Sequence, residues 1–481
     1  MLVTLPRDIL LYVFRYLKVR DIISVRQTCS TLYLATEHRS VWLYAAQDIN
    51  YALPQLLDLA PMSKLELMKH VMREANVDSA WRYGTLLSGE HEAVTPINRT
   101  YPHEGHIFRV QFLSGGEWIV VVSRRGEITL RRVNDWSVGA SLVSQPEIWR
   151  PSQAWGVKGC HIGLSTKQES ILAITFIMEQ GRDVIHVFRL KTSPTPSVDY
   201  MFKAASRHGH VRSAYVGGPF LTFVVPMVSN MAKIHVVSLE DPKKQIVMQL
   251  QDVSFLHGVA ITRFFSKSRL ILVDEKGISI VNVPPMPLQP SSITIGVDGI
   301  SAVDITDVEH TRIHLFNGEQ ASIMSDCLWW HSPAETLPPL ILRTRRKWSS
   351  ESPYVHIITP PRNRSESALP THNIIKLPTL CNSTFVQSGS LRSIALENDE
   401  HTLHLLSYDE LDVSRDACWP PGVQIRSIVL PDRSVPLAFD EISGRICSFA
   451  RATELDPACV TITDFVASIG LNGGQGVCRS P

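Results

Sequence analysis

The spacing of apolar residues divides the chain into a short helical beginning and a long strand-rich remainder. Between Leu5 and Trp42, apolar positions recur at the three- and four-residue spacing of α-helices. From His106 almost to the C-terminus, short apolar or alternating runs are separated by turn residues, which is typical of antiparallel strands. We therefore predict an α+β multidomain chain, all-α at its N-terminus and all-β beyond it.

The first predicted helix carries apolar residues on nearly all of its sides. Pro6 suits a first helical turn, and from Ile9 to Leu17 only Arg15 interrupts the apolar run. A helix with one apolar stripe buries one face, whereas this helix needs cover from two directions. Because about 40 residues rarely form an independent core, the second cover must come from the rest of the chain or from another protein.

An ordered set of positions in this segment resembles an F-box. They are Leu5-Pro6, Asp8-Ile9-Leu10, Phe14, Leu17, Asp21-Ile22, Val25-Arg26, Cys29 and, after a gap, Trp42. The resemblance implies docking on a Skp-type adaptor, which connects the module to a cullin, while the rest of the chain holds a substrate protein. In this family a bulky aromatic residue is common three residues after the cysteine, where this chain has Leu32. The alternative is a helical cap that packs on the next domain.

Adaptor binding is expected to use the apolar residues of this module, because its first helix has more apolar surface than the module can bury alone. The predicted adaptor-binding residues are Leu5, Pro6, Ile9, Leu10, Val13, Phe14, Leu17, Ile22, Val25 and Trp42. Truncating a buried anchor of this kind costs on the order of 2 kcal/mol of binding free energy.

The segment that follows is predicted to be a helical linker. Ser63 and Glu66 have the spacing of a capping box, and apolar residues from Leu65 to Ala75 then recur on one helical face. A flexible tether would be richer in Gly and Ser, so we expect the linker to hold the F-box at a fixed attitude. The predicted domains are the F-box module at 1–46, the helical linker at 47–84, a β-domain at 85–470 and a flexible tail at 471–481.

The clearest strand pair of the β-domain lies within residues 104–133. Trp118 to Ser123 is one predicted strand, Arg124-Arg125-Gly126 is the turn, and 127–133 is the partner strand. Gly105-His106 lies where the Gly-His pair of a WD repeat lies, so the unit resembles a degenerate WD repeat that lacks the closing Trp-Asp. Similar strand pairs are predicted at 171–190, 220–239, 270–283, 303–316, 391–406 and 437–449.

The recurrence of these pairs favours a ring of sheets. Most of them are separated by the roughly 40 to 50 residues of a propeller blade. Many short antiparallel sheets in one chain leave edges open to other chains, and a closed ring shortens and protects those edges. A β-sandwich is the rival fold, but it would not need so many strands. We predict an all-β propeller of about seven blades, with six or eight as alternatives.

One part of the β-domain, residues 328–380, is predicted to be a long irregular insertion in which only 354–358 forms a strand. It contains a basic group formed by Arg343, Arg345, Arg346 and Lys347. Because arginine binds phosphate through paired hydrogen bonds, this group is a candidate contact for a phosphate or an acidic substrate. The alternatives are a nuclear-import signal and a solvated loop.

Composition argues against several classes of function. Lys+Arg 47 and Asp+Glu 46 give a formal net charge of +1, so no general attraction to nucleic acid is expected. The 8 cysteines are scattered without a CxxC pair or zinc spacing. Arg7, Asp8 and Arg15 interrupt the apolar N-terminus, which fits neither a signal peptide nor a membrane span. We expect a cytoplasmic or nuclear protein that does not act at membranes.

Motifs for catalysis or metal binding are missing from the sequence. It has no GxSxG, HExxH or P-loop motif, and no GxGxxG between a strand and a helix. Three near pairs of histidines lack the further ligands of a metal site; they are His103 and His106, His208 and His210, and His401 and His404. We therefore predict no catalytic residue, no metal and no cofactor.

Two functions from different classes fit these observations. The first is a substrate-recruiting adaptor subunit of an SCF-type cullin ubiquitin ligase, with the F-box on a Skp-type adaptor and propeller loops holding an unknown protein substrate. The second is a propeller-based enzyme or ligand sensor in which the N-terminal helices are a structural cap. A third interpretation is an F-box that works outside a ligase.

Overall fold

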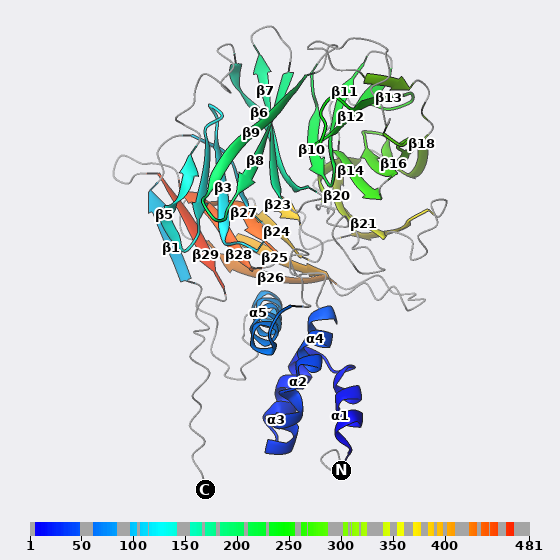
Figure 1. The fold of residues 1–481 in the computed structure, drawn as a ribbon. Coiled ribbons are helices and arrows are strands. Elements are labelled where there is room, and N and C mark those ends of the chain that lie inside the picture. The colour runs from blue at the N-terminus through cyan, green and yellow to red at the C-terminus, as the bar shows by residue number, and fades with distance from the viewer. Residues whose placement is uncertain are drawn as a thin grey trace.

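A small helical module is joined through one long helix to a ring of β-sheets (Figure 1) in the computed structural model. The structure describes residues 5–48, 61–83, 97–102, 106–113, 115–141, 154–165, 169–178, 183–205, 210–227, 230–254, 261–266, 268–286, 302–305, 308, 310–316, 319–324, 340–346, 354–359, 369–376, 383–388, 392–397, 402–408, 423–430, 434–441, 443–450 and 458–465. The predicted flexible tail at 471–481 lies outside these residues.

Four short helices form the N-terminal module: α1 (Arg7–Phe14), α2 (Val19–Arg26), α3 (Ser30–Thr36) and α4 (Arg39–Asp48). Their interior is filled by apolar side chains from every helix, among them Leu10, Phe14, Ile22 and Trp42. The indole Nε1 of Trp42 donates a hydrogen bond to the carbonyl oxygen of Thr36 at 2.8 Å, which satisfies its polar atom inside the core. The four helices therefore share one apolar core, to which Leu67 and Val71 of the next helix also belong.

A single helix, α5 (Lys64–Tyr83), spans the described part of the predicted linker. The predicted capping box is present: the backbone N–H of Ser63 donates to Glu66 Oε2 at 2.7 Å, and the backbone N–H of Glu66 donates to Ser63 Oγ at 3.3 Å. At about 1.5 Å per residue, a helix of this length spans roughly 30 Å. Figure 1 shows α5 between the module and the ring. Neither α5 nor any other described helix is both long and apolar enough to cross a membrane.

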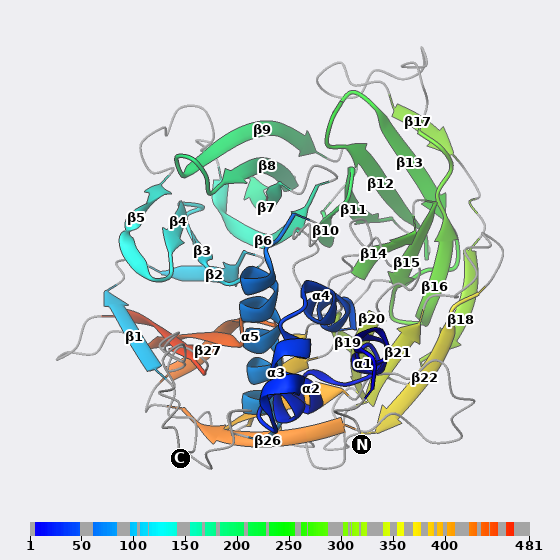
Figure 2. The same ribbon diagram turned by 60° about the horizontal axis from the view of Figure 1, so that its bottom comes forward.

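The described strands form seven sheets, and Figure 2 shows them arranged as a ring. Blades 1 to 7 begin with strands β2, β6, β10, β14, β19, β23 and β27, and the first strands of neighbouring blades lie against one another, as β2 does against β6 and β27. An all-α N-terminus followed by an all-β propeller of seven blades is thus confirmed.

The strands are assigned to blades as follows. From the inner strand outwards, blade 1 is β2 (Ile107–Phe112), β3 (Trp118–Ser123), β4 (Ile128–Arg132) and β5 (Asp135–Ser141); blade 2 is β6 (Ala154–Leu164), β7 (Ser170–Met178), β8 (Asp183–Lys191) and β9 (Ser197–Ala205); blade 3 is β10 (Ser213–Gly217), β11 (Phe220–Pro226), β12 (Ala232–Ser238), β13 (Gln245–Leu250) and β17 (Ala302–Ile305); blade 4 is β14 (Ile261–Ser266), β15 (Arg269–Val273), β16 (Gly277–Asn282) and β18 (His310–Leu315). Blade 5 is β19 (Glu319–Met324), β20 (Leu340–Arg346), β21 (Tyr354–Thr359) and β22 (Thr371–Lys376); blade 6 is β23 (Ser383–Ser388), β24 (Arg392–Glu397), β25 (Thr402–Tyr408) and β26 (Val423–Val429); blade 7 is β27 (Ser434–Asp440), β28 (Arg445–Ala450), β29 (Cys459–Asp464) and β1 (Ile97–Pro102).

Blade 7 closes the ring by combining both ends of the β-domain. Its outer strand β1 comes directly after the helical part of the chain and pairs antiparallel with the last strand, β29, with Ile97 opposite Asp464. Arg445 strengthens this closure, since its Nε donates to Asp464 Oδ2 at 2.8 Å and its Nη1 donates to the carbonyl oxygen of Gly116 in blade 1 at 2.7 Å. The two ends of the β-domain are thereby joined within a single blade.

Two predictions about the β-domain were wrong. The stretch 328–380 is not merely an irregular insertion, because it contains β20, β21 and β22, which build blade 5 together with β19. Strand β22 was not predicted from the sequence. It is an outermost strand, and its mostly exposed side chains show no apolar alternation. The pair predicted at 303–316 also fails, since β17 runs parallel to β13 in blade 3 whereas β18 belongs to blade 4.

Candidate functional site

One side of α1 is buried and the other is open. Leu10 and Phe14 are 3% and 2% exposed and pack inside the helical module. On the opposite side, the α1 stripe consists of Leu5, Ile9, Tyr12 and Tyr16, which are 38%, 44%, 59% and 66% exposed. Ile9 and Tyr12 share one face of α1, while Leu5 comes just before the helix and Tyr16 just after it. Among the described residues these four form an exposed apolar surface of the kind that the sequence predicted.

Tyr12 and Tyr16 hold each other in place at one end of the stripe. Their hydroxyl oxygens are 3.0 Å apart in a hydrogen bond, and their rings meet edge to face with centroids 5.3 Å apart. The hydrogen bond with Tyr12 raises the pKa of Tyr16 above its ordinary value. Two ordered phenol rings offer a partner both apolar area and a polar group at low entropy cost. The predicted adaptor-binding residues do not include these tyrosines, although their spacing from Leu5 and Ile9 is visible in the sequence.

The predicted adaptor-binding residues divide into three groups. Ile9 on α1, and Leu5 and Pro6 just before that helix, are exposed. Val13, Leu17 and Val25 are partly buried. The remaining four, Leu10, Phe14, Ile22 and Trp42, are buried in the module interior, so their side chains do not form a surface for direct contact. Four short helices need a core of their own, and these large apolar residues build it.

A second exposed apolar region lies on α3, which contacts α1. Leu34 and Tyr33 are exposed there. The guanidinium carbon of Arg26 lies 4.2 Å from the centroid of the Tyr33 ring, a cation–π contact that fixes the ring. The module therefore carries exposed apolar residues on both α1 and α3.

The first half of α5 is fixed to the module. Leu67 and Val71 are buried in the module core. Glu37 of the module forms an ion pair with Arg26 at 2.6 Å and a second one with Lys64 of α5. Partial burial pushes the pKa of Glu37 upwards, but hydrogen bonds from Lys64 and Arg26 outweigh it and hold the pKa below its ordinary value.

The second half of α5 is fixed to blades 6 and 7. The buried Trp81 packs against Phe439 and Phe465 of blade 7, with ring centroids 5.7 and 6.3 Å apart. Asp78 forms an ion pair with Arg392 of blade 6 at 3.2 Å, and Arg426 donates a hydrogen bond to the carbonyl oxygen of Ala80. One continuous helix therefore enters the cores of both the module and the propeller.

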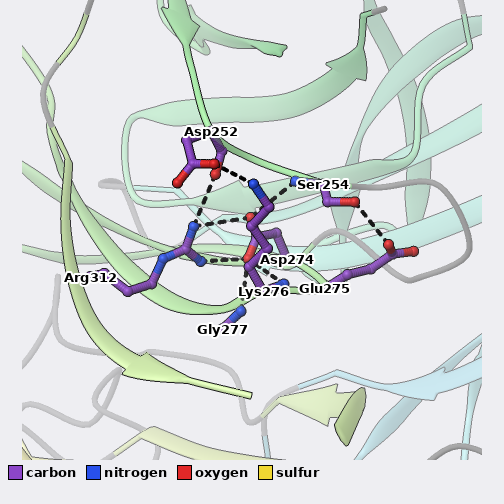
Figure 3. A network of polar contacts seen from close by, with 7 residues as sticks. All are labelled: Asp252, Ser254, Asp274, Glu275, Lys276, Gly277 and Arg312. Carbon is purple, nitrogen blue, oxygen red and sulfur yellow. Dashed lines mark hydrogen bonds and ion pairs between the residues drawn. The ribbon is translucent and has the colours of Figure 1, made fainter. Parts of the chain in front are cut away.

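A polar network around the buried Asp274 lies on the propeller between blades 3 and 4 (Figure 3). The fully buried carboxylate of Asp274 accepts hydrogen bonds from the backbone N–H groups of Ser254, Lys276 and Gly277 at 3.2, 3.0 and 2.9 Å, and from Arg312 Nη1 at 2.6 Å. Lys276 also pairs with Asp252. These donors saturate Asp274, so the carboxylate fixes the turn between β15 and β16 and is not available as a catalytic base.

This network marks the propeller face opposite to α5. It lies at a turn between the second and third strands of a blade, whereas α5 contacts Arg392 and Gly444 beside the connections between first and second strands. In an antiparallel blade these two kinds of connection lie at opposite ends of the strands. The face that carries the Asp274 turn is therefore separated from the helical module by the thickness of the ring.

The basic group predicted to contact phosphate is not an exposed cluster in the part that the structure describes. Arg343 lies on β20, the second strand of blade 5, and is only 4% exposed. Its prediction as a surface contact was wrong because the segment is a blade strand, covered on both sides, instead of a loop. Lys347 and the side chains of Arg345 and Arg346 lie outside the described residues.

Histidines gather between blades 4 and 5, away from the predicted pairs. Nδ1 of His356 is 3.0 Å from Nε2 of His372, Nε2 of His356 is 2.7 Å from Thr344 Oγ1, and the His314 ring lies beside both imidazoles. Burial lowers the pKa of His356 to about 3 and that of His372 to about 4. The His356 and His372 imidazoles are therefore neutral at physiological pH. Among the described residues, no group of three His, Cys, Asp or Glu could hold a metal ion; His103, His208 and His401 lie outside them.

Comparisons with known proteins identify the helical module. A family model described as F-box-like matches residues 2–45. No curated protein matches the chain. The N-terminal module is therefore an F-box-like domain, and the order of strands in the seven sheets establishes the propeller.

Several solved structures are similar to the chain at low sequence identity. The β-propeller domain of Myceliophteria thermophila Cps50 (Swd1) shares 10% identity at a TM-score of 0.44, over 76% of this chain and 99% of that one. The WD40 domain of SCAP from fission yeast shares 12% identity at a TM-score of 0.35, over 77% of this chain and 98% of that one. BamB from Moraxella catarrhalis shares 9% identity at a TM-score of 0.38, over 77% of this chain and 97% of that one.

Proposed function

We propose that this protein is a substrate-recruiting adaptor subunit of an SCF-type cullin ubiquitin ligase. Its F-box-like module would dock on a Skp-type adaptor, and propeller loops would hold the substrate protein while other subunits transfer ubiquitin. F-box-like domains and propellers of this kind typically serve interaction. The observation that carries the proposal is the α1 stripe, an apolar surface left open by a module whose helices already share one core.

The proposal gives the linker helix a defined role. Since α5 is packed into both the module and blades 6 and 7, a substrate on the propeller would be held at a fixed distance from the bound adaptor. The propeller face that carries the Asp274 turn is the proposed substrate face, because α5 partly covers the other one. No catalytic group of this chain is required for such a role, which depends on position alone.

Binding to a purified Skp-type adaptor tests the docking step. We expect Leu5→Asp and Ile9→Asp to weaken binding on the order of 30-fold each, since a charge in an apolar contact surface removes an anchor worth about 2 kcal/mol. Leu315→Asp is the matched control, because Leu315 is 69% exposed on β18 of blade 4, away from the module. Isothermal titration of the full-length protein gives the dissociation constants.

Two results would reject this function. One is a wild-type protein that does not bind the adaptor at all. The other is equal binding by Leu5→Asp and Leu315→Asp, which would mean that the α1 stripe is not the docking surface. Retention of a substrate protein by the Leu5→Asp variant, together with loss of the adaptor, would support the division of labour between module and propeller.

A further inference from the structure

Glu74 is a buried carboxyl at the place where α5 passes from one domain to the other. It lies between Val71, which packs in the F-box-like module, and Val77, which packs against blades 6 and 7. The side chain is 3% exposed. Neither Oε1 nor Oε2 has a hydrogen-bond partner among the residues that the structure describes. A charged carboxylate without partners is costly to bury, whereas a protonated one is far less so.

The charged groups around Glu74 do not remove this cost. Arg73 on α5 and Arg392 on β24 favour its charged form, while Asp440 and Glu441 at the end of β27 oppose it. These last two carboxyls have donors of their own: Asp440 Oδ2 accepts from the backbone N–H of Ser443 at 2.7 Å, and Glu441 Oε1 accepts from that of Arg392 at 2.8 Å. Burial is the largest effect and raises the pKa of Glu74 to about 8.

We propose that Glu74 is a proton-controlled lock of the joint between α5 and the propeller: the joint is tight while the carboxyl carries a proton and loosens when the proton is lost. The lock acts on docking of the second half of α5, where Val77 and Trp81 enter the propeller. Loosening therefore frees the orientation of the F-box-like module while both domains stay folded. This inference rests on the geometry of the joint and holds whichever partner the module binds.

The direction of the pH dependence follows from linkage. Docking of α5 is favoured at lower pH, because Glu74 keeps its proton in the docked state and loses it in the undocked state. The docking equilibrium constant therefore falls as pH rises towards the pKa of the docked state. Between about pH 6.5 and about pH 8, the docking equilibrium constant should fall on the order of tenfold. His70 on the same helix works in the opposite sense, but burial lowers its pKa below the ordinary 6.5, so it titrates below this range.

Hydrogen exchange of the full-length protein tests the lock. Protection factors, which correct for the intrinsic pH dependence of amide exchange, are measured for the segment from Val77 to Trp81 at several pH values in this range. We expect protection to fall about tenfold in the wild type and to stay constant in Glu74→Gln, which has the same shape without a titrating proton. Glu66→Gln is the matched control, because Glu66 is an exposed acid on α5 whose capping bonds hold its pKa below the ordinary value; it should follow the wild type.

Constant wild-type protection would overturn the proposal, and so would a parallel fall in Glu74→Gln. If Glu74→Gln did not fold, the wild type would still decide, with β12 of blade 3 as the internal reference. A fall confined to Val77–Trp81 supports the lock, and an equal fall in β12 overturns it.

Discussion

The indole Nε1 of Trp81 donates a hydrogen bond to the carbonyl oxygen of Leu406 at 3.1 Å, joining residues 325 positions apart in the chain. Trp81 lies in the last turn of α5, and Leu406 lies on the third strand of blade 6. The bond therefore connects the helical part of the molecule to a strand near the end of the chain. The indole ring of Trp81 is buried among apolar side chains of blades 6 and 7.

Replacing Trp81 with Ala should destabilise the propeller and undock α5. Truncating a buried Trp costs about 3–5 kcal/mol of unfolding free energy, and the loss here falls on the joint and its two blades. Trp81→Phe keeps most of the apolar area and removes the N–H, so its cost should be smaller. Urea unfolding of the three proteins measures the difference, and equal midpoints for wild type and Trp81→Ala would contradict the packing described above.

Leu10 and Ile9 are neighbours in sequence with opposite roles. Leu10→Ala should lower the stability of the F-box-like module by about 2–5 kcal/mol, because Leu10 is buried in its core. Ile9→Ala should change stability by less than about 0.5 kcal/mol, since the residue is on the exposed stripe, and should instead weaken adaptor binding. Thermal unfolding and adaptor titration on both variants check the contrast; the reverse pattern would mean that the two sides of α1 are misassigned.

Gly116 should not tolerate any side chain. Its φ of +67° is in the left-handed region, and a Cβ there would lie 2.1 Å from Ser443 Oγ and 2.7 Å from Ser443 Cβ in blade 7. Gly115 is the matched control, with φ of +88° but nothing within 4 Å of a Cβ. Gly115→Ala should cost about 1–2 kcal/mol for the backbone conformation alone. A larger loss in denaturant midpoint for Gly116→Ala would establish the additional clash between blades 1 and 7, and equal losses would exclude it.

Glu37 should make the F-box-like module sensitive to acid. Because its ion pairs hold the folded pKa below the ordinary 4.5, the stability that it contributes is present above that value and is lost as pH falls through the folded pKa. Glu37→Gln should therefore unfold at a lower temperature than the wild type at neutral pH, and the difference should shrink in acid. Circular dichroism of helix unfolding measures the unfolding temperatures of the two proteins at neutral and at acid pH. A difference that does not change with pH would show that the charge of Glu37 does not stabilise the module.

Sequence patterns predicted the features whose interacting residues are close together in the chain. The capping box at Ser63 and Glu66 was found because both partners lie within one helical turn. Helix starts without such a signal are harder to place: Asp21 is a residue type that often caps helices, but α2 begins at Val19 after Lys18, which makes no side-chain cap bond. Asp21 lies in the first turn, where its charge still suits the helix dipole.

The features that sequence reasoning missed depend on distant neighbours. Apolar residues such as Phe14 and Ile22 look the same whether they fill a core or meet a partner, so only packing could assign them to the interior. Arg343 belongs to a run of basic residues that is typical of a loop. In the structure it lies on β20, which pairs with β19 on one side and β21 on the other. The charged propeller neighbours of Glu74, namely Arg392, Asp440 and Glu441, likewise lie more than three hundred residues later in the sequence.

The pairing of β1 with β29 sets an order of events during protein synthesis. The helical module and β1 leave the ribosome first, but blade 7 cannot form until Cys459–Asp464 has been translated. A premature stop codon before this point would produce a chain with a complete F-box-like module and an open propeller. Such a product would still occupy adaptor molecules under the proposed function while delivering no substrate, so late nonsense alleles should act dominantly over the intact gene.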